Sequence, residues 1–346
     1  MTSQNRKVNR RVLLASRPVG APTADNFKMD EQPIPKPGEG EVLLRTLYLS
    51  LDPYMRGRMS DAASYAAPTP LGSVMGGGTV AIVEVSNNSS FAVGDLVESY
   101  VGWQDYGISN GKELVKLKGV ELKHPSYAVG VMGMPGFTAY QGLIDIGNPQ
   151  PGETVVVAAA TGAVGSVVGQ VAKLKGCHVV GIAGGPEKCK YAVEKLGFDK
   201  CIDHKSDNLK QQLQDACPKG IDVYFENVGG KVFEAVFPLL NTKARVPVCG
   251  LISAYNATSI NHSEIALAQF QGAILKKRMR VQGFIIFQDY FIFYDEFKKV
   301  MGKWVEDGKI FFKEDVVEGL ENSQNAFIGL LEGKNFGKLV IHVGDV

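Results

Sequence analysis

Segment 154–174 constrains the fold of this chain more strongly than any other part of the sequence. Its strand-like part, 155–159, reads VVVAA, which is typical of a parallel strand buried on both faces. The residues ATGAVG at 160–165 form a glycine turn that opens a stretch of helical character ending near Leu174. A buried strand, a glycine turn and a helix in this order predict a βαβ unit and therefore a parallel sheet.

Strands and helices continue to alternate after this unit. The expected strands are 154–159, 178–182, 223–225, 244–248 and 280–286, and the expected helices are 137–146, 164–174 and 187–196. This alternation predicts a doubly wound Rossmann domain, which we place at residues 131–311. Because 346 residues exceed one ordinary core, a second domain is expected.

The rest of the sequence has the pattern of a β-rich domain. Short apolar alternations at 41–49 and 78–85 predict strands that Gly and Pro turns separate, and several strands at this spacing indicate a β-barrel or a sandwich. The stretch 338–343 has the same character and is expected to pack on this domain. The domain then comprises residues 1–130 and 312–346.

The glycine turn matches the fingerprint of a dinucleotide-binding loop, with Ala160 at the first glycine position. Gly162 lets the backbone approach a pyrophosphate, and Gly165 lets the helix pack closely on the strand. The N-terminus of the helix presents N–H groups and a partial positive charge to phosphates. We predict a dinucleotide site here; a purely structural turn is the alternative interpretation.

The end of the next strand indicates which dinucleotide binds. NAD sites generally carry an acid there, about 20 residues after the glycine loop, to hold the ribose 2′-hydroxyl. Here the strand ends in Gly184 and Gly185, and the first acid is Glu187, followed by Lys188. A missing acid and a following lysine favour NADPH, although Lys188 alone also fits an ordinary surface lysine.

Several kinds of chemistry have no motif in this sequence. There is no Cys-x-x-Cys and no His-x-x-x-His, so we expect no metal site. A hydrolase elbow of the Gly-x-Ser-x-Gly type and a P-loop lysine are also absent. A hydride acceptor must then be activated by hydrogen bonds, and tyrosine hydroxyls are suitable neutral donors.

Three tyrosines are the candidate catalytic residues: Tyr255, Tyr54 and Tyr65. Tyr255 follows the expected strand 244–248 closely, and ligands of parallel sheets bind where the strands end. Ordinary packing is the alternative role for each of the three.

Composition restricts the partners and the compartment. The chain has 37 basic and 36 acidic residues and a net charge of +1, which argues against nucleic-acid and membrane partners. The basic start around Arg6 and Lys7 is followed by only a short apolar stretch, 12–15, which does not fit a signal peptide. The five cysteines include no closely spaced pair and are expected to be reduced thiols in a cytoplasmic protein.

Five motifs in this order resemble the zinc-independent medium-chain dehydrogenase/reductase family. They are LSLDPYMR (49–56), MPGFTAY (134–140), AATGAVG (159–165), ENVGG (226–230) and GKNFGK (333–338). The similarity extends over nearly the whole chain and is strongest to the prostaglandin reductase and leukotriene dehydrogenase branch, which includes bacterial NADPH-dependent curcumin reductases.

The resemblance implies a GroES-like β-barrel catalytic domain beside the Rossmann domain. It also implies NADPH-dependent reduction of the carbon–carbon double bond of α,β-unsaturated ketones and aldehydes, by hydride addition to the β-carbon and protonation of the enolate. The cofactor contacts carried over from the family and from the loop analysis are Gly162, Ala163, Val164, Gly165, Ser166, Gly184, Lys188, His204, Asn227, Cys249, Gly250, Ser253, Tyr255, Phe284, Ile285, Ile286 and Asn335.

The chain departs from relatives at two positions. His204 stands where relatives commonly have tyrosine beside the adenosine phosphate, so its protonation is expected to make NADPH affinity depend on pH. Loop 257–265 lacks the Pro-Gly-Pro stretch that is common in relatives, which leaves it less constrained and affects the substrate size that it admits.

Two other functions stay open on the sequence alone. One is an NADPH quinone reductase of the same fold, and the other is a non-catalytic NADPH-binding sensor. The expected strand 280–286 is apolar and would be a sheet edge, so pairing with a second copy predicts a homodimer. No side chain is an obvious proton donor to carbon, and water is the expected proton source.

Overall fold

The computed structural model describes residues 8–259, 263 and 265–346 of the chain. It separates into two compact units, unit 1 (Met1–Gly130 with Glu314–Val346) and unit 2 (Val131–Lys313). The basic residues Arg6 and Lys7 lie outside the described residues, as does most of the stretch 260–264 in loop 257–265. No helix in the described part of the chain combines the length and the apolar character that crossing a membrane requires.

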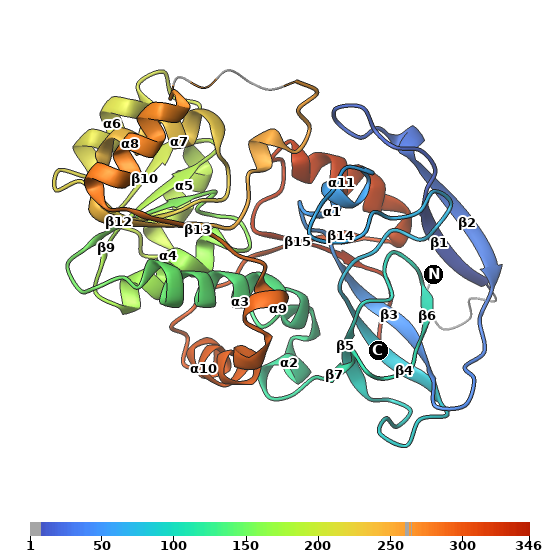
Figure 1. The fold of residues 1–346 in the computed structure, drawn as a ribbon. Coiled ribbons are helices and arrows are strands. Elements are labelled where there is room, and N and C mark those ends of the chain that lie inside the picture. The colour runs from blue at the N-terminus through green and yellow to red at the C-terminus, as the bar shows by residue number, and fades with distance from the viewer. Residues whose placement is uncertain (1–7, 260–262, 264) are drawn as a thin grey trace. The chain divides into compact units, whose positions relative to one another are not determined.

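Unit 2 is built around a parallel sheet of six strands (Figure 1). The strands are β8 (Thr154–Ala158), β9 (His178–Ala183), β10 (Lys200–Asp203), β11 (Ile221–Phe225), β12 (Leu240–Val248) and β13 (Arg280–Gly283). Their order in the sheet is β10-β9-β8-β11-β12-β13, which is the doubly wound order 3-2-1-4-5-6. The predicted Rossmann sheet is therefore confirmed, with its topological switch point between β8 and β11.

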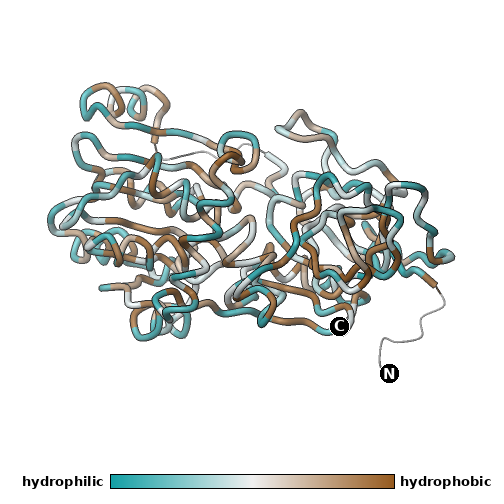
Figure 2. Tube along the Cα trace, turned by 90° about the horizontal axis from the view of Figure 1, so that it is seen from below, coloured by the Kyte–Doolittle hydropathy of each residue, from teal (hydrophilic) through white to brown (hydrophobic). Residues whose placement is uncertain are grey.

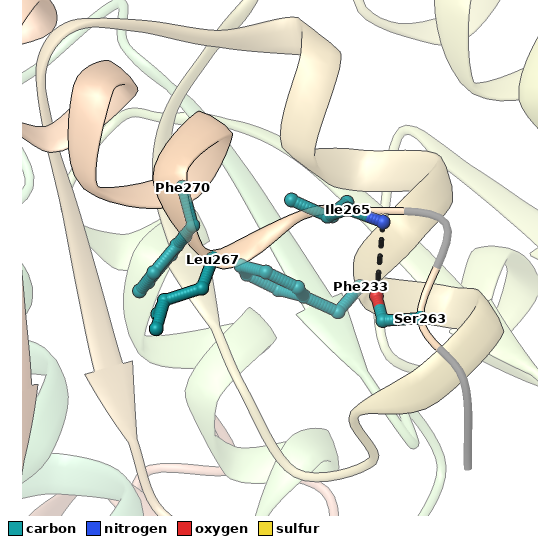
Figure 3. Close-up of a pocket in the computed structure, with 5 residues that line it drawn as sticks. All are labelled: Phe233, Ser263, Ile265, Leu267 and Phe270. Atoms are coloured by element: carbon teal, nitrogen blue, oxygen red, sulfur yellow. Dashed lines mark hydrogen bonds between the residues drawn. The ribbon is translucent and has the colours of Figure 1, made fainter.

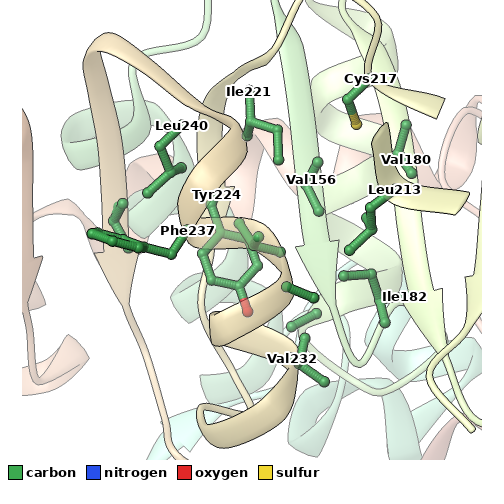
Figure 4. Close-up of a cluster of buried hydrophobic side chains, with 14 of the residues drawn as sticks. Val156, Val180, Ile182, Leu213, Cys217, Ile221, Tyr224, Val232, Phe237 and Leu240 are labelled. Atoms are coloured by element: carbon green, nitrogen blue, oxygen red, sulfur yellow. The ribbon is translucent and has the colours of Figure 1, made fainter. Parts of the chain in front are cut away.

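Helices cover both faces of this sheet. They are α3 (Met134–Gln141), α4 (Gly165–Leu174), α5 (Pro186–Glu194), α6 (Leu209–Ala216), α7 (Gly230–Val236), α8 (Leu267–Lys277), α9 (Ile286–Asp289) and α10 (Tyr294–Glu306). All five residues of β8 are buried, as its continuous apolar sequence predicts. On one face Val156 and Tyr224 pack with Leu213 of α6 and Val232 of α7 (Figure 4).

Several predicted element boundaries in unit 2 are wrong, including the start of the strand expected at 244–248, which begins at Leu240. The strand expected at 280–286 ends at Gly283, and Ile286 begins the short helix α9. The Asp289 carboxylate accepts a hydrogen bond from the Ile285 N–H at 2.7 Å, which stabilises the start of α9 and ends the extended backbone. Helix α3 begins earlier than expected, at Met134, because Pro135 is favourable in the first turn of a helix.

Unit 1 contains a seven-stranded sheet and a separate hairpin. The hairpin pairs β1 (Val8–Leu14) with β2 (Phe27–Pro33), and the sheet contains β3 (Val42–Ser50), β4 (Thr79–Ser86), β5 (Leu96–Ser99), β6 (Tyr106–Ser109), β7 (Val115–Lys116), β14 (Glu314–Glu318) and β15 (Lys338–His342). Its helices are α1 (Met55–Arg58), α2 (Val120–Lys123) and α11 (Ser323–Leu331). Hydrophobic residues gather along the inner strands of each unit, and the outer loops are mostly hydrophilic (Figure 2).

Strand β3 organises the sheet of unit 1. It pairs with β4 on one side, and with β6 and β15 on the other. Through β15 the C-terminal segment becomes part of the same sheet as the N-terminal strands. A buried ion pair reinforces this connection, because Lys338 Nζ of β15 contacts Asp52 Oδ1 at 2.9 Å, just after β3.

Candidate functional site

The predicted phosphate loop leaves β8 at the switch point of the sheet. Ala159 has a left-handed backbone, with φ of 52°, which turns the chain sharply after the strand. The Ala160 N–H then donates to the Ile182 carbonyl of β9 at 3.0 Å, and the Gly162 N–H donates to the Ala159 carbonyl at 2.9 Å. These two hydrogen bonds fix the loop on the end of the sheet.

Glycine is needed at positions 162 and 165 of the loop for different structural reasons. A Cβ atom on Gly165 would lie 2.3 Å from the Ala159 carbonyl oxygen, so α4 can pack this close to the loop only without a side chain there. A Cβ atom on Gly162 would meet one atom, the same oxygen, at 3.3 Å. Packing therefore requires a glycine less strictly at position 162 than at position 165. The role of Gly162 in letting a pyrophosphate approach stays a prediction.

Alanine at the first fingerprint position is accommodated by a glycine on the neighbouring strand. A Cβ atom on Gly181 of β9 would lie 2.8 Å from the Cβ atom of Ala160. Ala160 is fully buried, so its methyl group occupies the space that a side chain at 181 would need. The remaining loop residues, Ala163, Val164 and Ser166, lie at the start of α4, where the Ser166 N–H donates to the Gly162 carbonyl at 3.0 Å.

Basic side chains lie near the end of β9. Gly184 follows β9, and a Cβ atom on it would lie 3.0 Å from Nε2 of His204, which comes directly after β10. Desolvation lowers the pKa of His204 below its ordinary value of 6.5; the nearby Asp203 opposes this change, and the positive charges of Lys205 and Lys188 add to it. The charge of Lys188 therefore acts on His204, so both residues lie near this end of β9.

Sequence reasoning missed Lys205 as a third cation at this edge. Asp203 is the acidic residue beside these basic side chains. Its Oδ1 is already hydrogen-bonded, because it accepts from the Gly185 N–H at 2.9 Å and from the Lys205 N–H at 3.0 Å. A lysine immediately after His204 at the end of the third strand was the available signal. We define Lys188, His204 and Lys205 as the cation cluster of unit 2, in which His204 becomes a cation only on taking up a proton.

Asn227 lies at the switch point itself. Its Nδ2 donates to the Ala158 carbonyl at 2.8 Å, which joins the end of β11 to the end of β8 beside the phosphate loop. Its neighbour Glu226 is 2% exposed, and Oε1 of Glu226 accepts hydrogen bonds from Tyr224 Oη at 3.0 Å and from the N–H groups of Val228 and Gly229 at 2.7 and 2.8 Å. Burial raises the pKa of Glu226.

Glu226 was not among the predicted site residues. It fixes the turn after β11 and, through its backbone, the next loop as well. Its carbonyl oxygen accepts hydrogen bonds from the N–H groups of Cys249 and Gly250 at 2.9 and 3.1 Å. An acid directly after a buried strand, within ENVGG, was the signal that could have identified it.

Loop 249–255 follows β12 and contains four predicted site residues: Cys249, Gly250, Ser253 and Tyr255. Ser253 Oγ donates to the Val228 carbonyl at 2.6 Å, and the Ser253 N–H donates to the same carbonyl at 3.1 Å. These bonds hold the loop along the turn after β11, so the structure brings its residues together with Asn227.

The Tyr255 hydroxyl turns back onto its own loop. It accepts a hydrogen bond from the Leu251 N–H at 3.4 Å, and a Cβ atom on Gly250 would lie 3.0 Å from the Tyr255 oxygen. Accepting an N–H donor polarises a hydroxyl and makes it a better donor itself. The same contact also gives Tyr255 a part in shaping its loop.

The three predicted residues after β13 contribute differently from one another. The side chains of Phe284 and Ile286 are buried, with exposed fractions of 8% and 7%, and the Phe284 ring makes edge contacts with the rings of Phe225 and Tyr290. Ile285 is half-buried. A cofactor contact at Phe284 or Ile286 is therefore one that their main-chain atoms would make.

Unit 1 brings the other two candidate tyrosines together. The Arg58 guanidinium of α1 lies 5.7 Å from the centroid of the Tyr54 ring and 4.5 Å from that of the Tyr65 ring, as in cation–π contacts. Tyr54 Oη also lies 3.1 Å from Tyr100 Oη. Tyr100 was not predicted, because it is 46 residues from Tyr54 in sequence and only the sheet places the two side by side.

The Tyr54 hydroxyl stays protonated over the ordinary pH range. Burial, followed by the neighbouring Tyr100 and Asp52, raises the pKa of Tyr54 well above its ordinary value of 10.0. The last predicted cofactor residue, Asn335, also belongs to unit 1. Its Nδ2 donates to the Gly337 carbonyl at 2.8 Å, in the turn that leads into β15.

Two further features were compared with the predicted site: groups of possible metal ligands, and a cavity in unit 2. Among residues 8–259, 263 and 265–346, no three His, Cys, Asp or Glu side chains are grouped so that they could hold a metal ion. A cavity of about 250 Å³ in unit 2 is lined by Phe233, Ser263, Ile265, Leu267 and Phe270 (Figure 3). None of these five residues belongs to the predicted cofactor or catalytic set.

Comparison with known proteins identifies the family. Residues 10–117 match the family model described as the N-terminal domain of oxidoreductase, and residues 163–306 match the one described as zinc-binding dehydrogenase. The chain is 60% identical over 343 residues to NADPH-dependent curcumin reductase of Escherichia coli (strain K12), which covers 99% of both chains. The chain belongs to the medium-chain dehydrogenase/reductase family.

Other members of this family place the chain more finely. Prostaglandin reductase 1 of Bos taurus is 41% identical over 326 residues, with 93% of this chain and 95% of the relative covered. The crystal structure of CurA in complex with NADPH from Vibrio vulnificus is 60% identical and superposes with a TM-score of 0.94, covering 97% of this chain and 100% of that one. The resemblance drawn from the five motifs and the two-domain fold class are confirmed.

Proposed function

We propose that this chain is an NADPH-dependent reductase of the carbon–carbon double bond in α,β-unsaturated ketones and aldehydes. The observation that carries the proposal is the cation cluster (Lys188, His204 and Lys205) beside the phosphate loop of a Rossmann sheet, in a chain that is 60% identical over its length to an NADPH-dependent curcumin reductase. A relative named 2-alkenal reductase, from Nicotiana tabacum, is 39% identical over 97% of both chains.

The residues of unit 2 fit an NADPH molecule part by part. The N-terminus of α4 and Gly162 would hold the pyrophosphate, because their N–H groups and the helix dipole favour negative charge. The cation cluster would hold the 2′-phosphate, where Asp203 is already engaged by backbone N–H groups. The remaining proposed contacts are Ala163, Val164, Gly165, Ser166, Gly184, Asn227, Cys249, Gly250, Ser253, Tyr255, Phe284, Ile285 and Ile286 in unit 2, and Asn335 in unit 1.

When bound, the nicotinamide supplies the hydride that adds to the β-carbon of the substrate. The protein then has to stabilise the negative charge that develops on the carbonyl oxygen. We assign this role to the hydroxyl groups of Tyr255, Tyr54 and Tyr65, since neutral donors aimed at a developing oxyanion are among the strongest contributions to catalysis. Tyr54 is suited to it, because its raised pKa keeps its proton in place. Water supplies the proton that the α-carbon takes up.

We further propose that two copies pair through β13. This strand is the last in the sheet order and, among the described strands, pairs with β12 alone, so its other edge offers unpaired N–H and C=O groups. The exposed side chains of Phe291 and Ile292 follow closely in sequence. Light scattering with chromatography should give twice the chain mass; a single chain mass at micromolar concentration would rule the pairing out.

A substrate panel tests the proposed reaction against its two rivals. The rate of NADPH oxidation is measured with matched enones, enals, their saturated ketones, and quinones. The proposal expects turnover of enones and enals, with saturated ketones inert. Faster turnover of quinones would indicate a quinone reductase, and tight NADPH binding without any turnover would indicate a sensor.

A further inference from the structure

Two thiols that have no role in the proposed reaction meet at the edge of the sheet of unit 2. Cys189 lies in the first turns of α5, and Cys201 lies on β10. Helix α5 packs on β10, and the two thiols, twelve positions apart in sequence, lie close enough for each to change the pKa of the other. Both side chains are partly exposed, whereas Cys177 and Cys217 are buried.

The strand register explains how the two sulfur atoms come together. Cys201 pairs with Gly181 of β9, and a Cβ atom on Gly181 would lie 3.1 Å from Cys201 Sγ. The sulfur of Cys201 therefore lies over the position where β9 has no side chain. Cys189 reaches this place from α5, where its thiol also interacts with the backbone of Ala183 at the end of β9.

The two thiols are not equivalent. The interaction between the two thiols lowers the pKa of Cys189 and raises that of Cys201. The N-terminal position of Cys189 in α5 also favours a thiolate. The three other cysteines show the opposite behaviour, because burial raises the pKa of Cys177 to about 11 and those of Cys217 and Cys249 to about 12.

We propose that Cys189 and Cys201 are an oxidisable dithiol, which a hydroperoxide converts to a disulfide between α5 and β10. In the first step the Cys189 sulfur attacks the peroxide, the O–O bond breaks, and Cys189 becomes a sulfenic acid with release of water or alcohol. In the second step the Cys201 sulfur displaces the hydroxyl group of the sulfenic acid. A second water leaves with the Cys201 proton, so two thiols lose two electrons and the peroxide gains them.

This disulfide would act on the cation cluster, a consequence that rests on the proposed function. Lys188 directly precedes Cys189, and His204 follows Cys201 by three positions. A disulfide bond is about 2.05 Å long, shorter than any hydrogen bond between two sulfur atoms. Its closure therefore pulls the first turn of α5 toward β10 and displaces Lys188 from the position that it has in the reduced protein.

Mass spectrometry of the intact protein after treatment with hydrogen peroxide tests the dithiol. The wild type should lose two hydrogen atoms, regain them with dithiothreitol, and give a peptide linking Cys189 to Cys201. Cys201→Ser should instead gain one oxygen at Cys189 and react there with dimedone, while Cys189→Ser should show neither change. Cys177→Ser is the matched control and should form the disulfide like the wild type. An unchanged wild-type mass, or equal labelling in the two variants, would overturn the proposal.

Cofactor titration separates this inference from the proposed function. Oxidised wild type should bind NADPH on the order of tenfold more weakly than reduced wild type, with NADH affinity little changed. Peroxide should leave the NADPH affinity of Cys201→Ser and Cys189→Ser within about twofold of its untreated value. If the disulfide forms and NADPH affinity stays constant, the coupling to the cation cluster is wrong. If reduced wild type does not bind NADPH at all, the proposed function itself is wrong, whatever the mass shows.

Discussion

The two ends of the proposed cofactor site in unit 2 are built from different parts of the chain. The phosphate loop consists of backbone: its hydrogen bonds join main-chain groups, and at Gly165 even a methyl group would lie 2.3 Å from a carbonyl oxygen. The cation cluster consists of side chains on two different elements, and its members His204 and Lys205 lie at the surface. Close backbone packing therefore shapes the phosphate loop, whereas charged side chains form the cation cluster.

The two ends are therefore expected to bind different parts of the cofactor. Backbone N–H groups at a helix N-terminus recognise a pyrophosphate, which NADH and NADPH share. Only the cation cluster is proposed to bind the 2′-phosphate that distinguishes the two cofactors. Changes in the loop are therefore expected to affect both cofactors and the fold, and changes in the cluster to affect NADPH alone.

The largest effect is expected from Gly165→Ala. The added methyl group forces α4 away from Ala159, which should lower the free energy of unfolding by about 1–3 kcal/mol. Both NADH and NADPH should bind on the order of 100-fold more weakly, because several hydrogen bonds to the pyrophosphate are lost together. Urea denaturation and fluorescence titration measure the two quantities.

Gly162→Ala is the matched control for this change. Its methyl group would lie 3.3 Å from one oxygen, so the free energy of unfolding should change by less than about 1 kcal/mol. Equal losses of stability in the two variants would show that the two glycines do not have separate roles.

Tyr255→Phe tests whether the turnover number can be lowered without weakening cofactor binding at the phosphate loop or the cation cluster. The turnover number should fall roughly 100-fold, as expected for one lost donor to an oxyanion. The affinity for NADPH should change little, because the hydroxyl of Tyr255 is assigned to the substrate oxygen, although the residue is also expected to contact the cofactor. Pre-steady-state and steady-state rates with an enone, together with cofactor titration, give the comparison.

The competing role of Tyr255 is to shape its loop through the bond from the Leu251 N–H. If that role dominates, Tyr255→Phe weakens NADPH binding and leaves the turnover number near the wild-type value. Tyr191→Phe, on α5 of the same unit, is the control and should match the wild type in both measurements.

Lys188→Ala tests the cation cluster directly. NADPH should bind about tenfold more weakly, the usual cost of one charge-assisted hydrogen bond, and NADH should bind as before. Lys190 on the same helix is the matched control; it is 71% exposed and lies 3.9 Å from Glu194. A loss of NADPH affinity in Lys190→Ala of the same size would mean that general charge, not position, attracts the phosphate.

The smallest effect is the pH dependence that His204 contributes. Its lowered pKa keeps the imidazole neutral near pH 7 in the free protein, and a phosphate beside it would raise that pKa and favour proton uptake. NADPH affinity of the wild type should therefore improve as the pH falls from about 7.5 to 6, relative to His204→Gln, by about threefold. Titration of both proteins at several pH values measures this; parallel curves would exclude His204 from the site.

The contrast between the two ends also explains what the sequence could predict. The phosphate loop follows from local rules, because a buried strand, a glycine turn and a helix are adjacent in the chain, and the structure places Gly162 and Gly165 as these rules require. Lys205 and Glu226 carried local signals that were not used, whereas Tyr100 was missed because its role depends on a contact across the fold. Tyr100 meets Tyr54 only through the pairing of strands in unit 1.

Element ends were predicted less well than element types for a similar reason. The strand expected at 280–286 reads RVQGFII, and its apolar residues continue past Gly283, so the sequence does not show that the strand ends there. The end is set by the hydrogen bond from the Ile285 N–H to the Asp289 carboxylate, which starts α9. Apolar residues such as Phe284 and Ile286 satisfy the core equally well from a strand or from a helix start.

The central claim is that hydride passes from NADPH to the β-carbon of an enone. Incubation with an enone and NADPH deuterated at the transferable position, followed by NMR of the product, tests it most directly. The product should be a saturated ketone with one deuterium on the β-carbon, a solvent proton on the α-carbon and an intact carbonyl group. Deuterium on the carbinol carbon of an allylic alcohol, or a product without deuterium, would contradict it.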